Sequence, residues 1–405
     1  MKIFKLGDFF DNFGDGIHGT PEYDNNGAFY FINGNNLQDG EVIILNDTPK
    51  ISLNEYKKIY RPLTTKTILL SINGTLGNIA IYNGEKIALG KSACFLNVKS
   101  DRNLYFVKYI LSSREFKKYM FLVAHGSTIK NLAPSQVAEY EFEAPSLETQ
   151  SQIGNFLYFI DRKILLNKKI NATLEAMAKT LYDYWFVQFD FPDENGKPYK
   201  TSGGKMIYNA ELGREIPAGW EVKRLSDFAI YATEKISSEN ISINQYIATD
   251  NMLSNMQGII ISQYEPLELK IQEFKCGDIL LANIRPYFKK IWLSYFDGGC
   301  NSDVLVIRSK NIKNAEYVYS TLARDDFFSY NVAGAKGTKM PRGDKTHIMQ
   351  YPILSNEILT KSFVDKVRPI YRKIYESTVE NNCLAALRDW LLPMLMNEQI
   401  KFKEF

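Results

Sequence analysis

The feature that most constrains the fold is a helical seam that occurs twice. Between Ser146 and Asp190 the chain has no proline and no glycine after Gly154. Apolar and amide residues recur there in steps of three and four, which is typical of one face of a long helix close to a heptad repeat. Ser146 is a suitable N-cap, and Glu148 places negative charge in the first turn. The seam consists of Ile153, Leu157, Ile160, Ile164, Asn167, Asn171, Leu174, Met177, Leu181 and Tyr184.

The same spacing returns near the C-terminus, because Phe363 lies 210 residues after Ile153 and the later positions keep this offset. We expect Pro192 to stop the first helix, and Pro393 to kink or end the second, since proline disrupts a helix interior. The shared offset favours a duplicated segment over two unrelated amphipathic helices on separate cores. The second seam consists of Phe363, Val367, Ile370, Ile374, Ser377, Asn381, Leu384, Leu387, Leu391 and Met394.

We expect the two helices to pair antiparallel, with the numbers of facing residues summing to 548. This register sets polar residues against polar residues, and a buried polar contact can fix a register at some cost in stability. A helix of ~41 residues is about 60 Å long, which corresponds to roughly 18 base pairs. Antiparallel helices would place the two globular units at opposite ends. The expected pairs are Asn167 with Asn381, Asn171 with Ser377, Ile164 with Leu384, Leu174 with Ile374, and Leu181 with Val367.

The segments outside the long helices also repeat. Residues 1–145 contain short β-rich runs, asparagine–glycine turns and a helical stretch from Asn103 to Ala124, which is typical of an α+β unit. After a polar linker, DILLAN at Asp278 repeats TILLSI at Thr67 with an offset of 211. We therefore expect an α+β fold with two pseudo-twofold-related globular domains joined by an antiparallel coiled coil. The expected segments are 1–145, 146–190 (spacer helix), 191–354 (linker and second domain) and 355–405 (second helix and tail).

Composition narrows the function classes. The chain has 405 residues and a net charge of only +3, which permits nucleic-acid binding but does not require it. No run approaches the ~18 apolar residues of a membrane span, and the N-terminus does not resemble a signal peptide. Scattered cysteines and histidines indicate a reduced cytoplasmic protein without a metal site. These residues are Cys94, Cys276, Cys300, Cys383, His18, His125 and His347.

No catalytic motif is present. The sequence lacks a G-x-x-x-x-G-K-[ST] loop, a G-x-G-x-x-G turn after a strand, and the acidic-Pro-Pro-aromatic tetrapeptide of amino-methyltransferases. Asp193 and Glu194 lie in a polar linker, where a metal role is remote. His125 beside Ser127 could suggest a base and a nucleophile, but a surface histidine that forms hydrogen bonds is the stronger interpretation. We expect no catalytic residue in this chain.

Polar and basic loops at matching places in both halves are the candidates for DNA recognition. Amide side chains can hydrogen-bond adenine, arginine and lysine can read guanine, and cations and open backbone can bind phosphate. The same residues could also be turn formers, solvated lysines or, for the aromatic ones, core. The candidates are Asn33, Asn35, Asn36, Asn73, Thr75, His125, Ser127, Thr128 and Lys130 in the first half, and Thr249, Asp250, Asn251, Arg285, Tyr287, Lys289, Lys336, Lys339, Arg342 and Lys345 in the second.

At the level of motifs, the chain resembles the specificity (S) subunit of type I restriction–modification enzymes over nearly its whole length. The motifs that carry the resemblance are IHGTPEY, FINGNNL, SINGTLGN, GSTIKNL, APSLETQSQIG, LEAMAKTLYDYWF, IPAGWEVKRLSDF, GTKMPRGD and LRDWLLPML. The resemblance implies two target-recognition domains that each bind half of a bipartite DNA sequence, with the helices fixing the gap. It also implies docking of two methyltransferase subunits, which bring S-adenosylmethionine, and of motor-nuclease subunits, which use ATP and Mg²⁺.

Aromatic residues at the helix ends are candidates for this docking, with packing in a core as an equal alternative. Two other function classes stay open from the sequence. A coiled-coil scaffold without nucleic acid would show no salt-dependent DNA binding. A self-contained DNA-modifying enzyme would show turnover by the purified chain. The candidate docking residues are Tyr184, Trp185, Phe186, Trp390 and Leu391.

Overall fold

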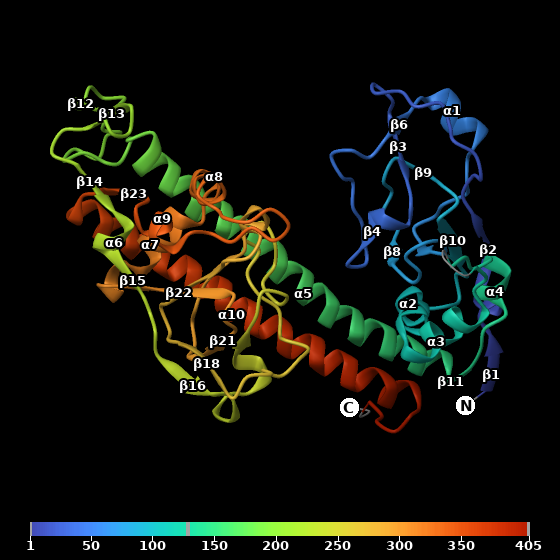
Figure 1. Cartoon of the computed structure of the whole chain (residues 1–405). Coiled ribbons are helices and arrows are strands. Elements are labelled where there is room, and N and C mark those ends of the chain that lie inside the picture. The colour runs from blue at the N-terminus through green and yellow to red at the C-terminus, as the bar shows by residue number, and fades with distance from the viewer. Residues whose placement is uncertain (1, 127–129, 403–405) are drawn as a thin grey trace. The chain divides into compact units, whose positions relative to one another are not determined.

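The computed structural model describes residues 2–126 and 130–402. The chain divides into two compact units (Figure 1). The first unit comprises Met1–Asn167 and Val379–Phe405, and the second comprises Lys168–Thr378. Each unit therefore contains one globular domain together with part of each long helix.

The first unit is built on a four-stranded antiparallel sheet in the order β2-β10-β7-β8. Its central strand β7 (Thr67–Ser71) is buried at every position, because its apolar side chains meet core on both faces. A second sheet, β6-β3-β9, pairs β3 with β9 in parallel. The other elements are β1 (Lys2–Lys5), η1 (Leu6–Phe9), β2 (Phe10–Asp15), β3 (Phe29–Ile32), η2 (Gly34–Asn36), β4 (Leu37–Gln38), β5 (Glu41–Val42), β6 (Lys50–Ile51), α1 (Leu53–Lys58), β8 (Ile79–Ile81), β9 (Ile87–Leu89), β10 (Ala93–Val98), α2 (Leu104–Ser112), α3 (Arg114–Val123), α4 (Pro134–Ala138) and β11 (Glu141–Ala144).

The stretch from Asn103 to Ala124 is helical as expected, but it is divided into two helices, α2 and α3. Ser113 interrupts them with extended backbone, and its hydroxyl accepts a hydrogen bond from Phe116 N at 3.1 Å. Serine favours such an N-cap because its oxygen satisfies a free amide at the start of the next helix.

The second unit repeats the fold of the first. Its main sheet has the order β15-β22-β19-β20, and β17 pairs in parallel with β21 as β3 does with β9. Strand β22 (Val304–Ser309) lies 211 residues after β10 at both ends, which confirms the expected duplication. The other elements are β12 (Met206–Asn209), β13 (Arg214–Pro217), β14 (Glu221–Arg224), α6 (Leu225–Phe228), β15 (Ala229–Tyr231), β16 (Lys235–Ser237), η4 (Ser238–Asn240), η5 (Ile243–Gln245), β17 (Tyr246–Ile247), β18 (Lys270–Phe274), β19 (Ile279–Ala282), η6 (Pro286–Phe288), β20 (Ile291–Leu293), β21 (Gly298–Cys300), η7 (Ile312–Asn314), α7 (Ala315–Leu322), α8 (Asp325–Ala333), α9 (Lys345–Met349) and β23 (Pro352–Ser355).

The two long helices form as expected, with different ends. Helix α5 (Leu147–Tyr182) begins after Ser146, whose hydroxyl accepts from Thr149 N at 3.2 Å, and it continues into a π-helical turn, η3 (Asp183–Val187). It ends before Pro192, because Phe189 adopts a left-handed backbone conformation with φ of 65°. An end of the second helix at Pro393 is wrong, since α10 (Glu357–Met396) runs three residues further.

Within each unit α5 and α10 run side by side in opposite directions, as Figure 1 shows in green and red. In the first unit Asn167 Nδ2 donates to Asn381 Oδ1 at 2.9 Å, which confirms the register sum of 548. In the second unit Asn171 Nδ2 donates to Ile374 O and Thr378 Oγ1, both at 3.3 Å, rather than to the expected Ser377. The amide therefore spans one turn of α10 instead of facing a single residue.

Candidate nucleic-acid interface

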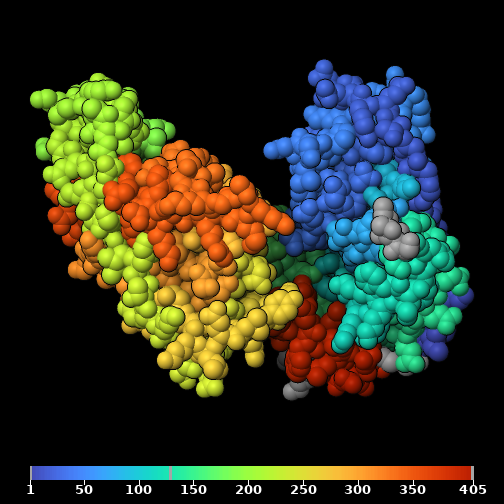
Figure 2. Space-filling model, viewed as in Figure 1, coloured from blue at the N-terminus to red at the C-terminus, as the bar shows by residue number. Residues whose placement is uncertain are grey.

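The candidate loops of the second unit converge on one place. Arg285 N donates to Pro341 O at 2.8 Å, and Gly343 N donates to Asn283 O at 3.1 Å, so the loop after β19 is joined to the loop after α8. Lys290 Nζ donates to Thr249 O at 2.5 Å and brings in the third candidate segment. The loop after α8, in orange, forms part of the surface of the second unit in Figure 2.

The first unit has the equivalent arrangement. Asn73 pairs with Asn131, and Asn131 pairs with His125, so the loop after β7 is joined to the loop after α3. Asn78 Nδ2 donates to Gly34 O at 3.4 Å and connects these loops to the segment of Asn33. The corresponding bridges of the second unit, Ile284 with Arg342 and Lys336 with Arg342, lie 211 residues later. Two of the candidates, Ser127 and Thr128, lie outside the described residues.

Two candidate asparagines have the same structural task in the two units. Asn36 is 4% exposed, and its Oδ1 accepts from Asn33 N at 3.0 Å while its Nδ2 donates to Ile43 O at 2.9 Å. Asn251 is 3% exposed, and it accepts from Ala248 N at 2.7 Å and donates to Ile260 O at 3.0 Å. Because both ends of each amide are used inside the domain, these side chains do not face a ligand, and we remove them from the candidate set.

The other candidates of the first unit differ in how far they reach solvent and in how many of their polar atoms are occupied. Asn33 is half-buried, and its Oδ1 accepts from Ser92 Oγ at 2.9 Å. Asn73 Nδ2 donates to Asn131 Oδ1 at 3.1 Å, so its amide is partly occupied. Asn35, Thr75 and His125 are exposed, and Lys130 is half-buried.

Ion pairs reduce the free positive charge of the second unit. Lys289 pairs with Asp325 at 2.5 Å, Arg342 pairs with Asp303 at 2.8 Å, and Lys336 pairs with Asp344. The hydrogen bond from Lys336, together with backbone amides of the following helix, lowers the pKa of Asp344 to about 2. No local pattern indicated that Asp325 and Asp303, from other segments, would pair with these cations. In the part of the chain that the structure describes, Lys339 and Lys345 are exposed and form no ion pair.

The remaining candidates of this cluster differ in how far they reach solvent. Asp250 is exposed and Thr249 is half-buried. Arg285 is half-buried, and its Nε has no hydrogen-bond partner. Burial lowers the pKa of Lys290, although Asp250 opposes this effect. Tyr287, for which a place in the core was the alternative, is exposed.

The expected docking residues separate into core and surface. Trp185 and Phe186 are buried in the main core of the second unit, so packing is the role that the structure gives them. Tyr184, between Asp183 and the buried Trp185, is exposed, as is Trp390. Leu391 is half-buried against the core of the first unit.

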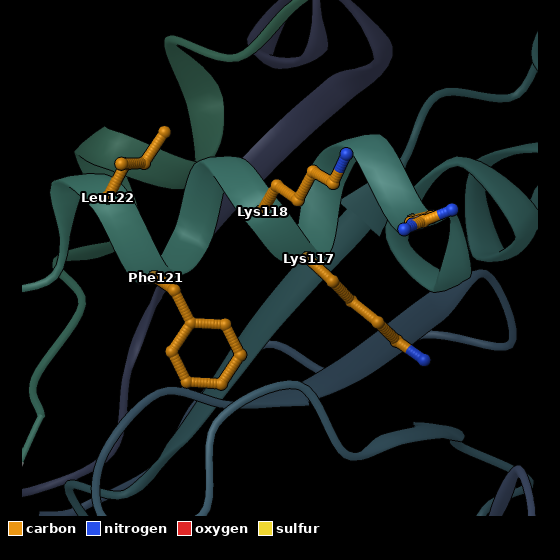
Figure 3. A pocket seen from close by; sticks show the side chains of 5 residues that line it. Lys117, Lys118, Phe121 and Leu122 are labelled. Carbon is orange, nitrogen blue, oxygen red and sulfur yellow. The ribbon is translucent and has the colours of Figure 1, made fainter.

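The sequence analysis missed a basic and apolar face on α3, which we call the α3 face. Its residues border a hollow of about 490 Å³ (Figure 3). The phenylalanine and leucine are exposed although they are large and apolar. Their spacing of three and four residues could have revealed this face, because it matches one side of a helix. The α3 face consists of Arg114, Lys117, Lys118, Phe121 and Leu122.

The α3 face has no counterpart in the second unit. Helix α8 takes the place of α3, and the 211-residue offset aligns Arg114 with Asp325, Lys117 with Phe328, and Lys118 with Ser329. Positive charge has thus been replaced by a negative, an apolar and a neutral residue. The two units share a fold but present different chemistry on it.

Among the described residues, no cluster of histidine, cysteine, aspartate and glutamate side chains could hold a metal ion. In the same part of the chain, no helix combines the length and apolar character that crossing a membrane needs.

Comparison with known proteins shows which proteins the chain is similar to. Residues 1–176 match the family described as "Type I restriction modification DNA specificity domain". The chain is 27% identical over 358 residues to the Type I restriction enzyme MjaIX specificity subunit of Methanocaldococcus jannaschii, with 84% of this chain and 78% of that protein covered. It is 24% identical over 387 residues to the HindI specificity subunit of Haemophilus influenzae, with 76% and 81% covered.

A solved structure agrees on the fold. The S subunit of a type I restriction–modification system from M. genitalium superimposes with a TM-score of 0.58 at 13% identity, covering 99% of this chain and 96% of that one. The family match in the first unit, the specificity subunits matched over most of the chain and the shared fold agree with one another. The chain is therefore similar in sequence to type I restriction enzyme specificity subunits, and it shares its fold with a solved S subunit.

Proposed function

We propose that this chain is the non-catalytic DNA-recognition subunit of a type I restriction–modification complex, and that it reads an asymmetric bipartite target. The observation that carries the proposal is the duplication, because two copies of one fold present loops at equivalent positions with different side chains. Because the scaffolds are equivalent, each domain can recognise one half-site. Because the loops differ, the two half-sites would have different sequences. The specificity-subunit names of the relatives support DNA recognition as the task.

Direct readout would come from exposed polar side chains of the converging loops. Asn35 and Thr75 in the first unit, and Asp250 in the second, can donate or accept hydrogen bonds at base edges. Lys339 and Lys345, which are exposed and form no ion pair in the described part of the chain, would contact phosphates, because a lysine that is not neutralised by an acid can displace the counterions of DNA. We add the α3 face of the first unit to the phosphate contacts.

The paired helices would set the gap between the half-sites and dock the other subunits. The register sum of 548 describes how the two helices align within the first unit. Exposed aromatic residues, Tyr184 and Trp390, would contribute to docking of two methyltransferase subunits, with motor-nuclease subunits joining the complex. S-adenosylmethionine, ATP and Mg²⁺ would be bound by those partners, in the cytoplasm.

The test is selection of DNA from a randomised duplex pool by the full chain with its methyltransferase partner, followed by sequencing of the bound fraction. We expect a bipartite, asymmetric motif with a fixed gap. A motif with a single half-site would contradict the proposal that both domains recognise DNA. A palindromic motif would contradict the proposal that the two domains recognise different sequences. If no DNA binds even at low salt, the protein is a coiled-coil scaffold and the proposal is wrong.

A further inference from the structure

Two strained turns meet beside the recognition loops of the second unit. Asn255, Met256, Arg285 and Lys289 have positive φ angles of 55°, 63°, 50° and 52°. Residues with a side chain rarely adopt this conformation, and it persists only where the surroundings enforce it. The turns are joined backbone to backbone, because Asn255 N donates to Phe288 O and Met256 N donates to Lys289 O, both at 2.8 Å. The strain is therefore concentrated in one small region.

The strained turns hold up two aromatic rings, Tyr287 and Phe288, which we call the aromatic wedge. Their ring centroids are 4.8 Å apart, and the residues are 49% and 40% exposed. Pro286 is buried beneath them and restricts the backbone of the turn. The ion pair of Lys289 with Asp325 fixes the far end of the turn. The chain thus holds two apolar rings rigidly in water, an arrangement that favours insertion into a partner over a place in the core.

The first unit has no such device. The equivalent loop, 72–78, makes its tight turns with Gly74 and Gly77, at φ of 73° and 88°, where glycine bears no strain. It presents the polar side chains of Asn73 and Thr75 instead of rings. Because only one copy carries strain and rings, the wedge is a feature of one half-site and not of the shared fold.

We propose that the aromatic wedge inserts between neighbouring base pairs in the half-site read by the second unit, and that it selects a base step that unstacks easily. This inference rests on the proposed function. Lysines lie near the rings. Lys290 Nζ is 5.9 Å from the Phe288 ring, and the loop joined to the same turn carries the exposed Lys339 besides the ion-paired Lys336 and Arg342. Exposed rings with lysines nearby fit DNA, because phosphates can meet the cations while the faces of the bases stack on the rings.

Insertion would give specificity without hydrogen bonds to bases. Pyrimidine–purine steps unstack and kink at the lowest cost, so the wedge would favour such a step at one position of the second half-site. Removing the rings removes the stacking between base and aromatic side chain, which should lower the affinity by about 10- to 100-fold. We expect this loss at the target sequence, with binding to non-specific DNA nearly unchanged.

The test is photo-crosslinking of the full chain with its methyltransferase partner, on the selected duplex with 5-iodouracil placed in turn at each thymine of the second half-site. Crosslinked peptides are identified by mass spectrometry. We expect one base step to crosslink to Tyr287 or Phe288. The double variant Tyr287→Ala/Phe288→Ala removes both rings and leaves no side chain large enough to insert, so it should lose both this crosslink and the preference for the step. Tyr264→Ala, which removes another exposed tyrosine of the same unit, is the matched control and should change neither.

The outcomes separate the two proposals. If a bipartite motif is selected but the crosslinks map elsewhere and the double variant binds with unchanged affinity, the wedge is refuted while the recognition function stands. If the double variant binds DNA normally but no longer associates with the methyltransferase subunit, the rings form a protein contact and the wedge is again refuted. If no specific duplex is selected, the proposed function fails and the wedge fails with it.

Discussion

A single carboxylate joins three elements of the first unit, and its removal gives a sharp prediction. Asp161 on α5 accepts hydrogen bonds from Tyr109 Oη at 2.6 Å and from Arg388 Nη1 at 2.7 Å, and it forms an ion pair with Lys108. These partners lie on α2 and α10, so the carboxylate connects the globular domain to both long helices. Burial by itself favours the protonated acid, but the cations and hydrogen bonds outweigh it and hold the pKa of Asp161 below its usual value.

The expected magnitude follows from the burial of the partners. In Asp161→Asn the two cations keep their positions but lose their counter-charge. Removing one member of a buried ion pair costs about 3–5 kcal/mol. The side chains of Asp161 and Arg388 are 19% and 29% exposed, so water screens part of the interaction and we expect the lower end, about 3 kcal/mol. For a unit of roughly 190 residues this lowers the unfolding midpoint by about 6–12 °C.

The assay has to report on the first unit alone, because a chain of two units need not unfold in one step. Hydrogen exchange of the amides of α2 does so, with strand β22 of the second unit as an internal reference. The matched control is Asp389→Asn, since Asp389 pairs with the same arginine at 2.7 Å but is 65% exposed. We expect the control to change stability by less than about 1 kcal/mol. Equal effects of the two substitutions would refute the argument from a buried charge.

The same carboxylate predicts a pH dependence. The pKa of Asp161 is lower in the folded state than in the unfolded state, so the unfolded chain takes up the proton first as pH falls. The carboxylate therefore stabilises the fold above the unfolded pKa of about 3.9, and this stabilisation is lost as the pH falls through the folded pKa. The difference between wild type and Asp161→Asn in urea midpoint should stay constant from about pH 7 to 5 and shrink below about pH 4. If the difference in urea midpoint between wild type and variant grew on acidification, the folded pKa of Asp161 would not be lowered.

Three further predictions concern DNA binding. Lys339→Ala should weaken binding to all sequences and reduce the slope of log K against log salt by about 0.9, and loss of specificity without loss of affinity would contradict a phosphate contact. Lys117→Ala/Lys118→Ala on the α3 face should reduce the same slope by up to about 1.8, and an unchanged slope in salt titrations would remove the α3 face from the interface. Deleting one heptad from each helix, residues 168–174 and 374–380, keeps the register sum of 548 and should shorten the selected gap by about 3 base pairs. An unchanged gap would refute the spacer role of the helices.

Much of the fold was predictable because it depends on local patterns. The strands at Thr67 and Asp278 follow from short β-rich runs, and their equivalence follows from the repeat itself. The break at Ser113 was missed because its neighbours are good helix formers, and only packing of two short helices on the sheet favours the cap over a continuous helix. The pairing of Asn167 with Asn381 was predictable because a long regular helix leaves few possible registers.

The candidate site was predictable as a set of loops but not residue by residue. Asn36 and Asn251 have amide side chains that could hydrogen-bond a base. Instead, the amide of Asn36 donates to a carbonyl group seven residues later, and that of Asn251 to a carbonyl group nine residues later. Trp185 and Phe186 carry the chemistry of a docking patch, but the domain of the second unit folds over them. Lys289 and Arg342 carry the charge of phosphate contacts, but acids from other elements partly neutralise them.

The sequence by itself determined the duplication, the two helical seams, their register and the loops that differ between the halves. These properties repeat along the chain, and a residue's neighbours at positions three and four away are enough to specify them. The tertiary structure decided which polar side chains form hydrogen bonds inside the domains and which cations form no ion pair. It also decided where strained backbone exposes two aromatic rings to water. Those properties depend on contacts between segments far apart in the sequence, which no local pattern records.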